Sequence, residues 1–424
     1  MSADVLGRTQ ARRVFLLLTA TRWLPVGLVI GIFSLLALER GLTLPQVMTY
    51  VAAQGIAVAL LELPTSGFAD AFGRKPVLVA AGVVNVVSGI AYAMAQSFWA
   101  FAVAAFLMGV YRALDSGPLE AWYVDTVHLH DPGGDVDRDL AHQGTVLGAS
   151  IAATAVLSGA LIALDPIDGW HPFTLPLVLY VVLCAVHLAA TLLLLREPPR
   201  GEGAGRAWAS VRETPMVIRD GLHLVLRNRV LGALVAVELF WATGMVVFEQ
   251  FQSLRLAELL GSETQAGAWS GPVAAVAWVV FAVGSALAGV LTPRIGVART
   301  AILARVLNGL GAVVMGLVAG PVALVLAYLV TYSLHGLAGA PHMALLHREA
   351  RSSNRATVLS LNSLVSFAAF AAASPALGHL AGATTTQTAM IAAGAFSVLG
   401  ALLYLPAARK ERGRAAEEEA PLAV

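Results

Sequence analysis

The segment Ser66-Gly-Phe-Ala-Asp70-Ala-Phe-Gly73-Arg74-Lys75 gathers three charges between two long stretches that are almost uniformly apolar. Glycine at position 73 permits a tight turn, because glycine has no Cβ atom. The residues before the segment run apolar from about position 46, and those after it run apolar to about position 96. The segment is therefore expected to be a short charged loop between two long apolar helices.

The composition indicates an integral membrane protein. Of 424 residues, 58% are hydrophobic and 12% are charged, whereas a soluble domain carries about 25% charged residues. So few charges cannot cover a water-facing surface, so most of the outside must face lipid. The net charge is +1 with no basic block that could follow phosphates, which excludes a nucleic-acid partner. The single cysteine, Cys184, excludes an internal disulfide.

Twelve stretches are long enough to span a bilayer, which takes about 20 apolar residues. Runs such as Leu192-Leu-Leu-Leu195 do not alternate between apolar and polar residues, so the spans are helices rather than β-strands. The first six are expected at about 14–38, 46–68, 77–96, 99–124, 142–164 and 173–195. The second six are expected at about 230–252, 269–291, 300–319, 322–345, 357–380 and 386–405.

The positions of Lys and Arg orient the chain. With the N-terminus inside, only Arg40 and Arg255 of the 27 Lys and Arg residues lie outside, and Arg22, Arg112 and Arg305 fall within spans. The positive-inside rule therefore predicts that both termini are cytoplasmic. The preference for Arg over Lys is typical of a GC-rich bacterial genome, which would place the protein in the inner (plasma) membrane.

A polar linker divides the chain into six spans and six spans. It opens with Pro and Gly, and its segment 211–229 can form a helix on the membrane surface. We expect an N-terminal half over 1–195, a cytoplasmic linker over 196–229, a C-terminal half over 230–405 and a cytoplasmic tail over 406–424.

Two segments of the second half repeat the first half at one offset. The loop after the eighth span contains Gly289, Arg294, Gly296 and Arg299, and aligning Gly73 with Gly296 gives an offset of 223 residues. The same offset superposes Leu114 on Leu337, Pro118 on Pro341 and Ala121 on Ala344. Duplicated halves, which are common in transporters, explain both matches, and chance agreement among small residues is the alternative.

These features together resemble the major facilitator superfamily (MFS) over essentially the whole chain. The signature of that family between spans 2 and 3 is Gly-x-Leu-Ala-Asp-Arg-x-Gly-Arg-Lys. Asp70, Gly73, Arg74 and Lys75 match it, whereas Ser66 and Ala71 replace the first Gly and the first Arg. The resemblance implies an all-α fold of twelve transmembrane helices in two six-helix halves. It also implies secondary transport by alternating access, and the interpretation we favour is an efflux-type member.

The loop between spans 2 and 3 has two interpretations. Asp70 can lie against the positive N-terminal end of span 11, and Arg74 can pair with Asp125 at the cytoplasmic end of span 4. The resemblance implies that this latch braces the outward-facing state. The alternative is that Arg74 and Lys75 only fix the orientation of the chain.

Charged residues within spans cost about 2.5–3.5 kcal/mol each and are therefore candidates for function. Arg22 and Glu62 are expected at one depth, roughly 10 Å into the membrane, where they can pair. Such a pair would serve either transport or packing alone.

The fourth span carries Arg112, Asp115 and Glu120, and Pro118 frees a main-chain carbonyl beside them. Arg112 and Asp115 are three residues apart, so they share a face of a continuous helix. The repeat sets His335 opposite Arg112. Family antiporters often carry Arg-x-x-Gln-Gly-x-Gly here, and only Arg112 fits well. The candidates for proton coupling are Glu62, Arg112, Asp115, Glu120 and His335.

The seventh span adds Glu238, Trp241 and Glu249. An acidic group beside an aromatic ring suits a cationic, lipophilic ligand, although Glu249 can instead lie at the outer interface. The candidates for the substrate cavity are Arg22, Glu238, Trp241 and Glu249. His142, His187, His342 and His379 are interpreted as packing or interface residues, and no metal site is expected.

Several signatures are absent from the sequence. It has no P-loop, no nucleophile elbow and no His-Glu-x-x-His, so we expect no enzyme activity and no cofactor. The glycine-rich antiporter signature of span 5 is missing from 144–160, which weakens the assignment to drug/proton antiporters.

Three functions remain open. The favoured one is a proton-coupled exporter of small lipophilic or cationic compounds, a multidrug type of antiporter. The second is an uptake symporter or facilitator for a metabolite such as a sugar or organic anion, whose site would need clustered Asn, Gln or Arg. The third is a membrane enzyme or sensor, which no loop supports. The expected partners are the solute, protons and the lipid bilayer, and the chain is expected to be monomeric.

Overall fold

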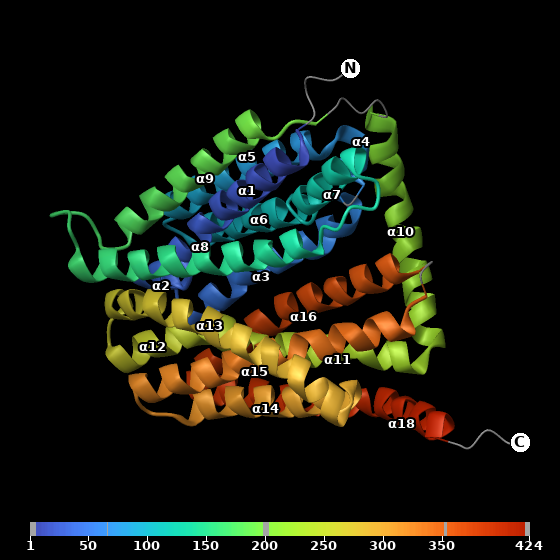
Figure 1. Ribbon diagram of the computed structural model, residues 1–424. Helices are drawn as coiled ribbons and strands as arrows, with labels where there is room; N and C mark the ends of the chain where they lie inside the picture. The colour runs from blue at the N-terminus through green and yellow to red at the C-terminus, as the bar shows by residue number, and fades with distance from the viewer. Residues whose placement is uncertain (1–5, 66, 198–202, 352–353, 420–424) are drawn as a thin grey trace, which may run out of the picture. The chain divides into compact units, whose positions relative to one another are not determined.

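The computed structural model describes residues 6–65, 67–197, 203–351 and 354–419 (Figure 1). Within these ranges every regular element is a helix, and twelve helical stretches are long and apolar enough to cross a membrane. They overlap the twelve expected stretches one for one, so the prediction of an all-α protein with twelve transmembrane helices is confirmed. The side of the membrane on which the termini lie stays a prediction.

The first six spans occupy the N-terminal half of the sequence, and three of the helices in it arise from breaks or loops. Span 1 consists of α1 (Arg8–Val29) and α2 (Ile32–Glu39), span 2 is α3 (Leu44–Thr65), and α4 (Phe68–Phe72) lies in the charged loop. Span 3 is α5 (Arg74–Met94), span 4 consists of α6 (Phe98–Leu114) and α7 (Pro118–His130), and spans 5 and 6 are α8 (Asp137–Leu164) and α9 (Thr174–Leu194).

The linker forms one helix, α10 (Gly203–Arg227), and six more spans follow it. Span 7 runs through α11 (Arg229–Val246), a π-helical turn η1 (Val247–Phe251) and α12 (Gln252–Leu260). Spans 8 to 11 are α13 (Glu263–Ile295), α14 (Val297–Leu317), α15 (Pro321–Glu349) and α16 (Arg355–Ala383). Span 12 consists of α17 (Thr386–Leu399), the 3₁₀ turn η2 (Gly400–Tyr404) and the first part of α18 (Leu405–Glu419).

The chain divides into two compact units, residues 1–214 with 260–276 and residues 215–259 with 277–424. In the first unit α1 packs against α8 and α9, and α5 packs against α6 and α9. In the second unit α11 packs against α16 and α17, and α14 packs against α15 and α17. Span 1 therefore has the same relation to spans 5 and 6 as span 7 has to spans 11 and 12, as duplicated halves require.

The backbone at the two aligned glycines is also the same. Gly73 has φ 95° and ψ 159°, and Gly296 has φ 90° and ψ 156°. Each directly precedes a helix of 21 residues, α5 after Gly73 and α14 after Gly296. Glycine adopts positive φ without strain, whereas other residues do so rarely. The repeat seen in the sequence thus extends to local conformation.

The repeat fails in span 4, which is broken where span 10 is continuous. Gly117 has φ 93° in the left-handed region, so α6 ends at Leu114 and α7 restarts at Pro118. Proline suits this first helical position, because its missing N–H would have no partner there. At the offset of 223 residues the second half has Ala340, and α15 runs on through Pro341. Alanine pays a steric penalty at positive φ, so only the first half contains the break.

Candidate functional site

A buried ion pair joins spans 1 and 4 in the first unit. Arg22 Nε lies 2.5 Å from Asp115 Oδ2, and Arg22 Nη2 donates a 2.9 Å hydrogen bond to the main-chain oxygen of Asp115. Only 13% of the Arg22 side chain and 3% of the Asp115 side chain are exposed. Glu120 Oε1 lies 3.6 Å from Arg22 Nη1 and accepts a hydrogen bond from Gln143. Two carboxylates of span 4 therefore share one guanidinium group.

This arrangement corrects two predicted pairings. Arg22 pairs with Asp115 rather than with Glu62, and Arg112 acts electrostatically on Glu62 rather than lying beside Asp115. The prediction assumed a continuous helix, in which Arg112 and Asp115 share a face. Because α6 ends at Leu114, Asp115 instead caps its C-terminus and turns toward α1. Arg112 remains exposed.

The loop between spans 2 and 3 contains the predicted pair of Arg74 and Asp125. Arg74 Nη1 lies 2.7 Å from Asp70 Oδ1, and Arg74 Nη2 lies 3.1 Å from Asp125 Oδ2. Lys75 Nζ donates a 2.7 Å hydrogen bond to the oxygen of Leu192 near the end of α9. The loop is thereby tied to spans 4 and 6 of its own unit. The contact of Asp70 with span 11 stays a prediction.

One carboxylate caps each of the two helices that follow the aligned glycines, α5 and α14. Neither of these carboxylates was predicted from the sequence. Glu197 Oε2 accepts a 2.9 Å hydrogen bond from the Lys75 N–H at the start of α5. Glu411 accepts hydrogen bonds from the Val297 N–H (3.1 Å) and the Ala298 N–H (2.9 Å) at the start of α14. A helix N-terminus has unpaired N–H groups and partial positive charge, so a carboxylate is stabilised there. An acidic residue just after span 6 and another near the end of span 12 are the signal that could have found them.

The other members of the second-half motif do not join this arrangement. Gly289 has open space around it, and Arg294 and Arg299 are exposed. Arg294 Nη1 donates a 3.4 Å hydrogen bond to Val290 within its own helix. Only Gly296 has the position that the alignment with the first loop predicts.

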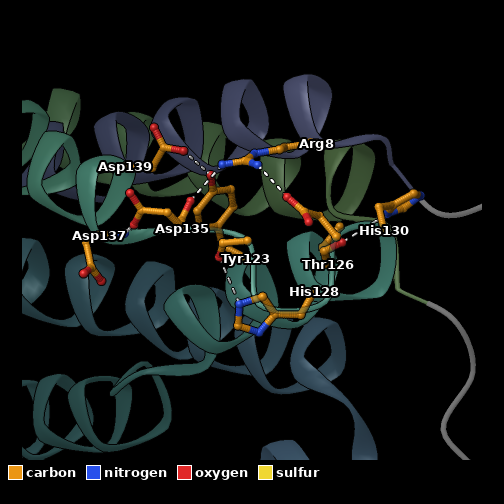
Figure 2. Close-up of polar contacts among 10 residues, drawn as sticks. Arg8, Tyr123, Thr126, His128, His130, Asp135, Asp137 and Asp139 are labelled. Carbon is orange, nitrogen blue, oxygen red and sulfur yellow. Dashed lines mark hydrogen bonds and ion pairs between the residues drawn. The ribbon is translucent and has the colours of Figure 1, made fainter.

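A polar network at the start of α1 was also not predicted (Figure 2). Arg8 Nη1 lies 2.9 Å from Asp131 Oδ2, and Arg12 Nε lies 2.5 Å from Asp139 Oδ1. Tyr123 donates a 2.5 Å hydrogen bond to Asp139 Oδ2. These contacts hold the start of α1 against the connection between α7 and α8, at the end of the span that carries Asp115.

The second unit contains a cavity of about 320 Å³ among α11, α14, α15 and α16. Its lining includes Glu238, Trp241, Arg305, His335, His342 and Asn362. Glu238, Trp241 and His335 were predicted as site residues, whereas Arg305 and Asn362 had no assigned role and His342 was assigned to packing. Glu249 is exposed in η1, where it interacts with Tyr332, and is not among the residues that line this cavity.

Glu238 is held by a hydrogen-bonded network within this cavity. His342 Nε2 lies 3.0 Å from Glu238 Oε1, and Asn362 Nδ2 donates a 3.2 Å hydrogen bond to the same oxygen. On its other side, His342 Nδ1 lies 2.9 Å from the hydroxyl of Tyr404. His342 is thus a buried residue with both ring nitrogens paired to protein groups, and its ring bridges Glu238 and Tyr404 at the cavity wall. Its assignment to packing stays a prediction.

Aromatic rings and one guanidinium group form the rest of the polar wall. The Arg305 guanidinium carbon lies 5.8 Å from the centre of the Trp241 ring, a distance typical of a cation–π contact. Trp241 stacks on His335 with ring centres 5.5 Å apart and planes inclined by 20°. The predicted approach of His335 to Arg112 joins the two units and stays a prediction. The described residues contain no cluster of three or more groups that could hold a metal ion.

Comparison with known proteins identifies the family. The sequence model of the Major Facilitator Superfamily matches residues 15–341 and, in a second match, residues 251–424. The chain belongs to the major facilitator superfamily. No curated protein matches its sequence.

Solved structures of MFS transporters share the fold. The nucleoside transporter NupG has 12% identity and a TM-score of 0.76, with 93% of this chain and 98% of that chain covered. A bacterial homologue of the human lysosomal transporter Spinster has 15% identity and a TM-score of 0.71, covering 95% and 97%. The D-xylose-proton symporter has 15% identity and a TM-score of 0.68, covering 94% and 96%. The protein is therefore a multi-pass MFS transporter, and its family and fold neighbours are transporters rather than enzymes.

Proposed function

We propose that this MFS protein is a proton-coupled transporter that moves a small organic solute by alternating access, with Asp115 carrying the proton. The observation that supports this most strongly is the buried Arg22–Asp115 pair at the break in span 4. A buried carboxylate whose charge is balanced mainly by one guanidinium group is energetically sensitive to any movement of that group. Such a pair is suited to linking a conformational change to protonation.

The break in span 4 supplies the movable part. α6 and α7 are joined only by Asp115, Ser116 and Gly117, so the two helices can change their mutual angle without breaking a regular helix. An opposite charge at short range favours the ionised carboxylate, and losing it in a low-dielectric surrounding favours the neutral one. In the proposed cycle, one conformation keeps Arg22 on Asp115, and the other separates them and lets Asp115 bind a proton.

The direction we propose is export, with protons moving inward in exchange. The cavity wall of Trp241, His335 and Phe367 suits a solute with an apolar ring, as expected for small lipophilic compounds. The Asp70, Gly73, Arg74, Lys75 and Asp125 cluster acts as the cytoplasmic latch in this proposal. The protein would act as a monomer in the inner membrane, with both termini in the cytoplasm.

Metabolite symport is the second candidate, and one observation favours it. Arg305 and Asn362, which are of the residue types that a metabolite site would need, line the cavity together with Ser363 and Ser366. Folding brings them together from spans 9 and 11. A nucleoside transporter and a D-xylose-proton symporter are among the structural neighbours, which is compatible with a polar solute.

Proton flux in proteoliposomes tests coupling and separates the two candidates. Vesicles with a trapped pH-sensitive dye would receive phenylalanine, uridine, xylose or tetraphenylphosphonium as a downhill solute gradient. An exporter that exchanges solute for protons alkalinises the compartment into which the solute flows, whereas a symporter acidifies it. Solute uptake without any change in lumenal pH would contradict proton coupling.

A further inference from the structure

The cavity of the second unit holds several polar atoms that have no protein partner. Glu238 Oε2, Arg305 Nε, Arg305 Nη1 and His335 Nδ1 are buried without a hydrogen bond in the part of the chain that the structure describes. Glu238 is 4% exposed and Arg305 is 3% exposed, and both line the cavity. A buried charged group that keeps an unsatisfied atom is costly in free energy. These unsatisfied atoms belong to residues that line one cavity, so a ligand in the cavity is expected to satisfy them.

The charges around the cavity do not suit a simple cation. Arg305 acts electrostatically on Glu238, and His342 and Asn362 already hydrogen-bond to Glu238 Oε1. One carboxylate oxygen is thus already hydrogen-bonded by the protein, and the charge lies within the field of Arg305. A lone cation bound at Oε2 would leave the Arg305 donors unsatisfied, and a lone anion on Arg305 would leave Oε2 unsatisfied. A ligand that carries one group of each sign satisfies both.

The remaining lining suits a flat ring. Trp241 and His335 are stacked with nearly parallel planes, and Phe367 lies on the cavity wall. Aromatic side chains favour stacked or edge-on contact with another ring. The volume of about 320 Å³ is near the lower end of ligand pockets, which span roughly 300–1,000 Å³, so the ligand must be small.

We propose that this cavity binds a small zwitterion with a flat ring, its carboxylate on Arg305, its ammonium group on Glu238 Oε2 and its ring against Trp241 and His335. An aromatic amino acid has this chemistry. The proposal rests on the proposed solute transport, and it names the class of solute.

Equilibrium binding to the purified full-length protein tests the proposal without transport. Phenylalanine is the zwitterion, and phenethylamine and 3-phenylpropionate are matched compounds that lack the carboxylate or the ammonium group. Trp241 lies in the site, so tryptophan fluorescence and calorimetry both report binding. Since a hydrogen bond to a charged group contributes about 1.5–3 kcal/mol, phenylalanine should bind at least about tenfold more tightly than either relative. Equal or tighter binding of phenethylamine, equal or tighter binding of 3-phenylpropionate, or no binding of phenylalanine overturns the proposal.

Two variants assign each half of the ligand to its residue. Arg305→Gln should weaken the binding of phenylalanine and 3-phenylpropionate and leave the binding of phenethylamine unchanged. Glu238→Gln should weaken the binding of phenylalanine and phenethylamine and leave the binding of 3-phenylpropionate unchanged. If Arg305→Gln does not fold, Arg305→Lys replaces it, because lysine keeps the buried positive charge. Arg305→Lys should also weaken the binding of the two ligands that carry a carboxylate. Equal losses for all three compounds indicate a packing role and contradict the assignment.

Asp70→Asn separates this inference from the proposed function. Asp70 lies in the loop between spans 2 and 3 of the first unit, and it is not among the residues that line the cavity. This variant should bind phenylalanine as the wild type does. Phenylalanine binding by the wild type without proton-linked transport of it would leave the cavity assignment standing and contradict only the proposed function.

Discussion

At the scale of single residues, the central feature is that a buried arginine serves two acids of one broken helix. Arg22 contacts Asp115 and Glu120, and of these Asp115 is almost fully enclosed. Taking both charges out of water is expensive, and their mutual attraction offsets that expense only while both are present. The intact pair therefore contributes little to stability, but separating its two charges costs much free energy. This property suits a conformational switch.

Removing one partner of this pair should destabilise the protein more than removing both. Arg22→Met leaves Asp115 as a buried charge without its main partner and should lower the free energy of unfolding by about 3–5 kcal/mol. The double variant Arg22→Met/Asp115→Leu should recover most of that loss. Thermal unfolding in detergent measures both, with Arg13→Met at an exposed arginine of the same helix as the control. A double variant less stable than Arg22→Met would contradict the account.

Sequence reasoning located the charged residues within the spans better than it identified their partners. The presence of Arg22, Asp115 and Glu238 within apolar spans follows from the sequence alone. The partners of Asp115 depend on the left-handed turn at Gly117, which periodicity does not encode. The partners of Glu238 are His342 and Asn362. Both lie far from Glu238 in the sequence and contact it only through the packing of helices.

At the scale of elements, the break in span 4 decides the geometry of the first unit. Sequence periodicity predicts one helix through this region, and a proline alone is compatible with that prediction, since α15 passes through Pro341 without interruption. The difference lies in Gly117, for which the second half has alanine at the aligned position. The spans themselves were predictable because bilayer thickness fixes their length and hydrophobicity.

Replacing Gly117 should therefore harm both stability and coupling. Gly117→Ala places a Cβ at φ 93°, which costs about 1–2 kcal/mol, and favours a continuous span 4 that turns Asp115 away from Arg22. We expect a lower unfolding temperature and loss of proton-linked transport. Gly148→Ala is the matched control, because Gly148 lies inside α8 with open space around it and alanine is the better helix former there. Equal effects of the two substitutions would show that the break has no special role.

At the scale of the whole molecule, the two units have similar folds and different functional residues. Both have a glycine turn, a helix of 21 residues and a carboxylate on its N-terminus. Only the first unit has the Arg74 pairs with Asp70 and Asp125, and only the second has the cavity with Glu238 and Arg305, as far as the described residues extend. We propose that the first unit provides proton coupling and gating, and that the second unit recognises the solute.

The latch prediction distinguishes a gating role from a stabilising one. The Asp70 side chain is 57% exposed in its pair with Arg74, and exposed pairs contribute only about 0–1 kcal/mol to stability. Asp70→Asn should therefore fold and reach the membrane at the wild-type level, yet lose most transport. Asp220→Asn, in the exposed pair with Arg219 of α10, is the control and should transport normally. Wild-type transport by Asp70→Asn at equal expression would rule out the latch.

Counterflow and gradient-driven uptake by Asp115→Asn test the central claim most directly. Asparagine keeps the shape of the side chain and cannot carry a proton, so alternating access should continue without coupling. In proteoliposomes loaded with a solute that the wild type transports, Asp115→Asn should still exchange labelled for unlabelled solute. It should fail to concentrate that solute when a pH gradient is imposed, whereas the wild type concentrates it. Asp165→Asn, at an exposed aspartate that directly follows α8, is the matched control and should also concentrate it. Accumulation by Asp115→Asn at the wild-type level under the same gradient would contradict the claim that Asp115 carries the coupled proton.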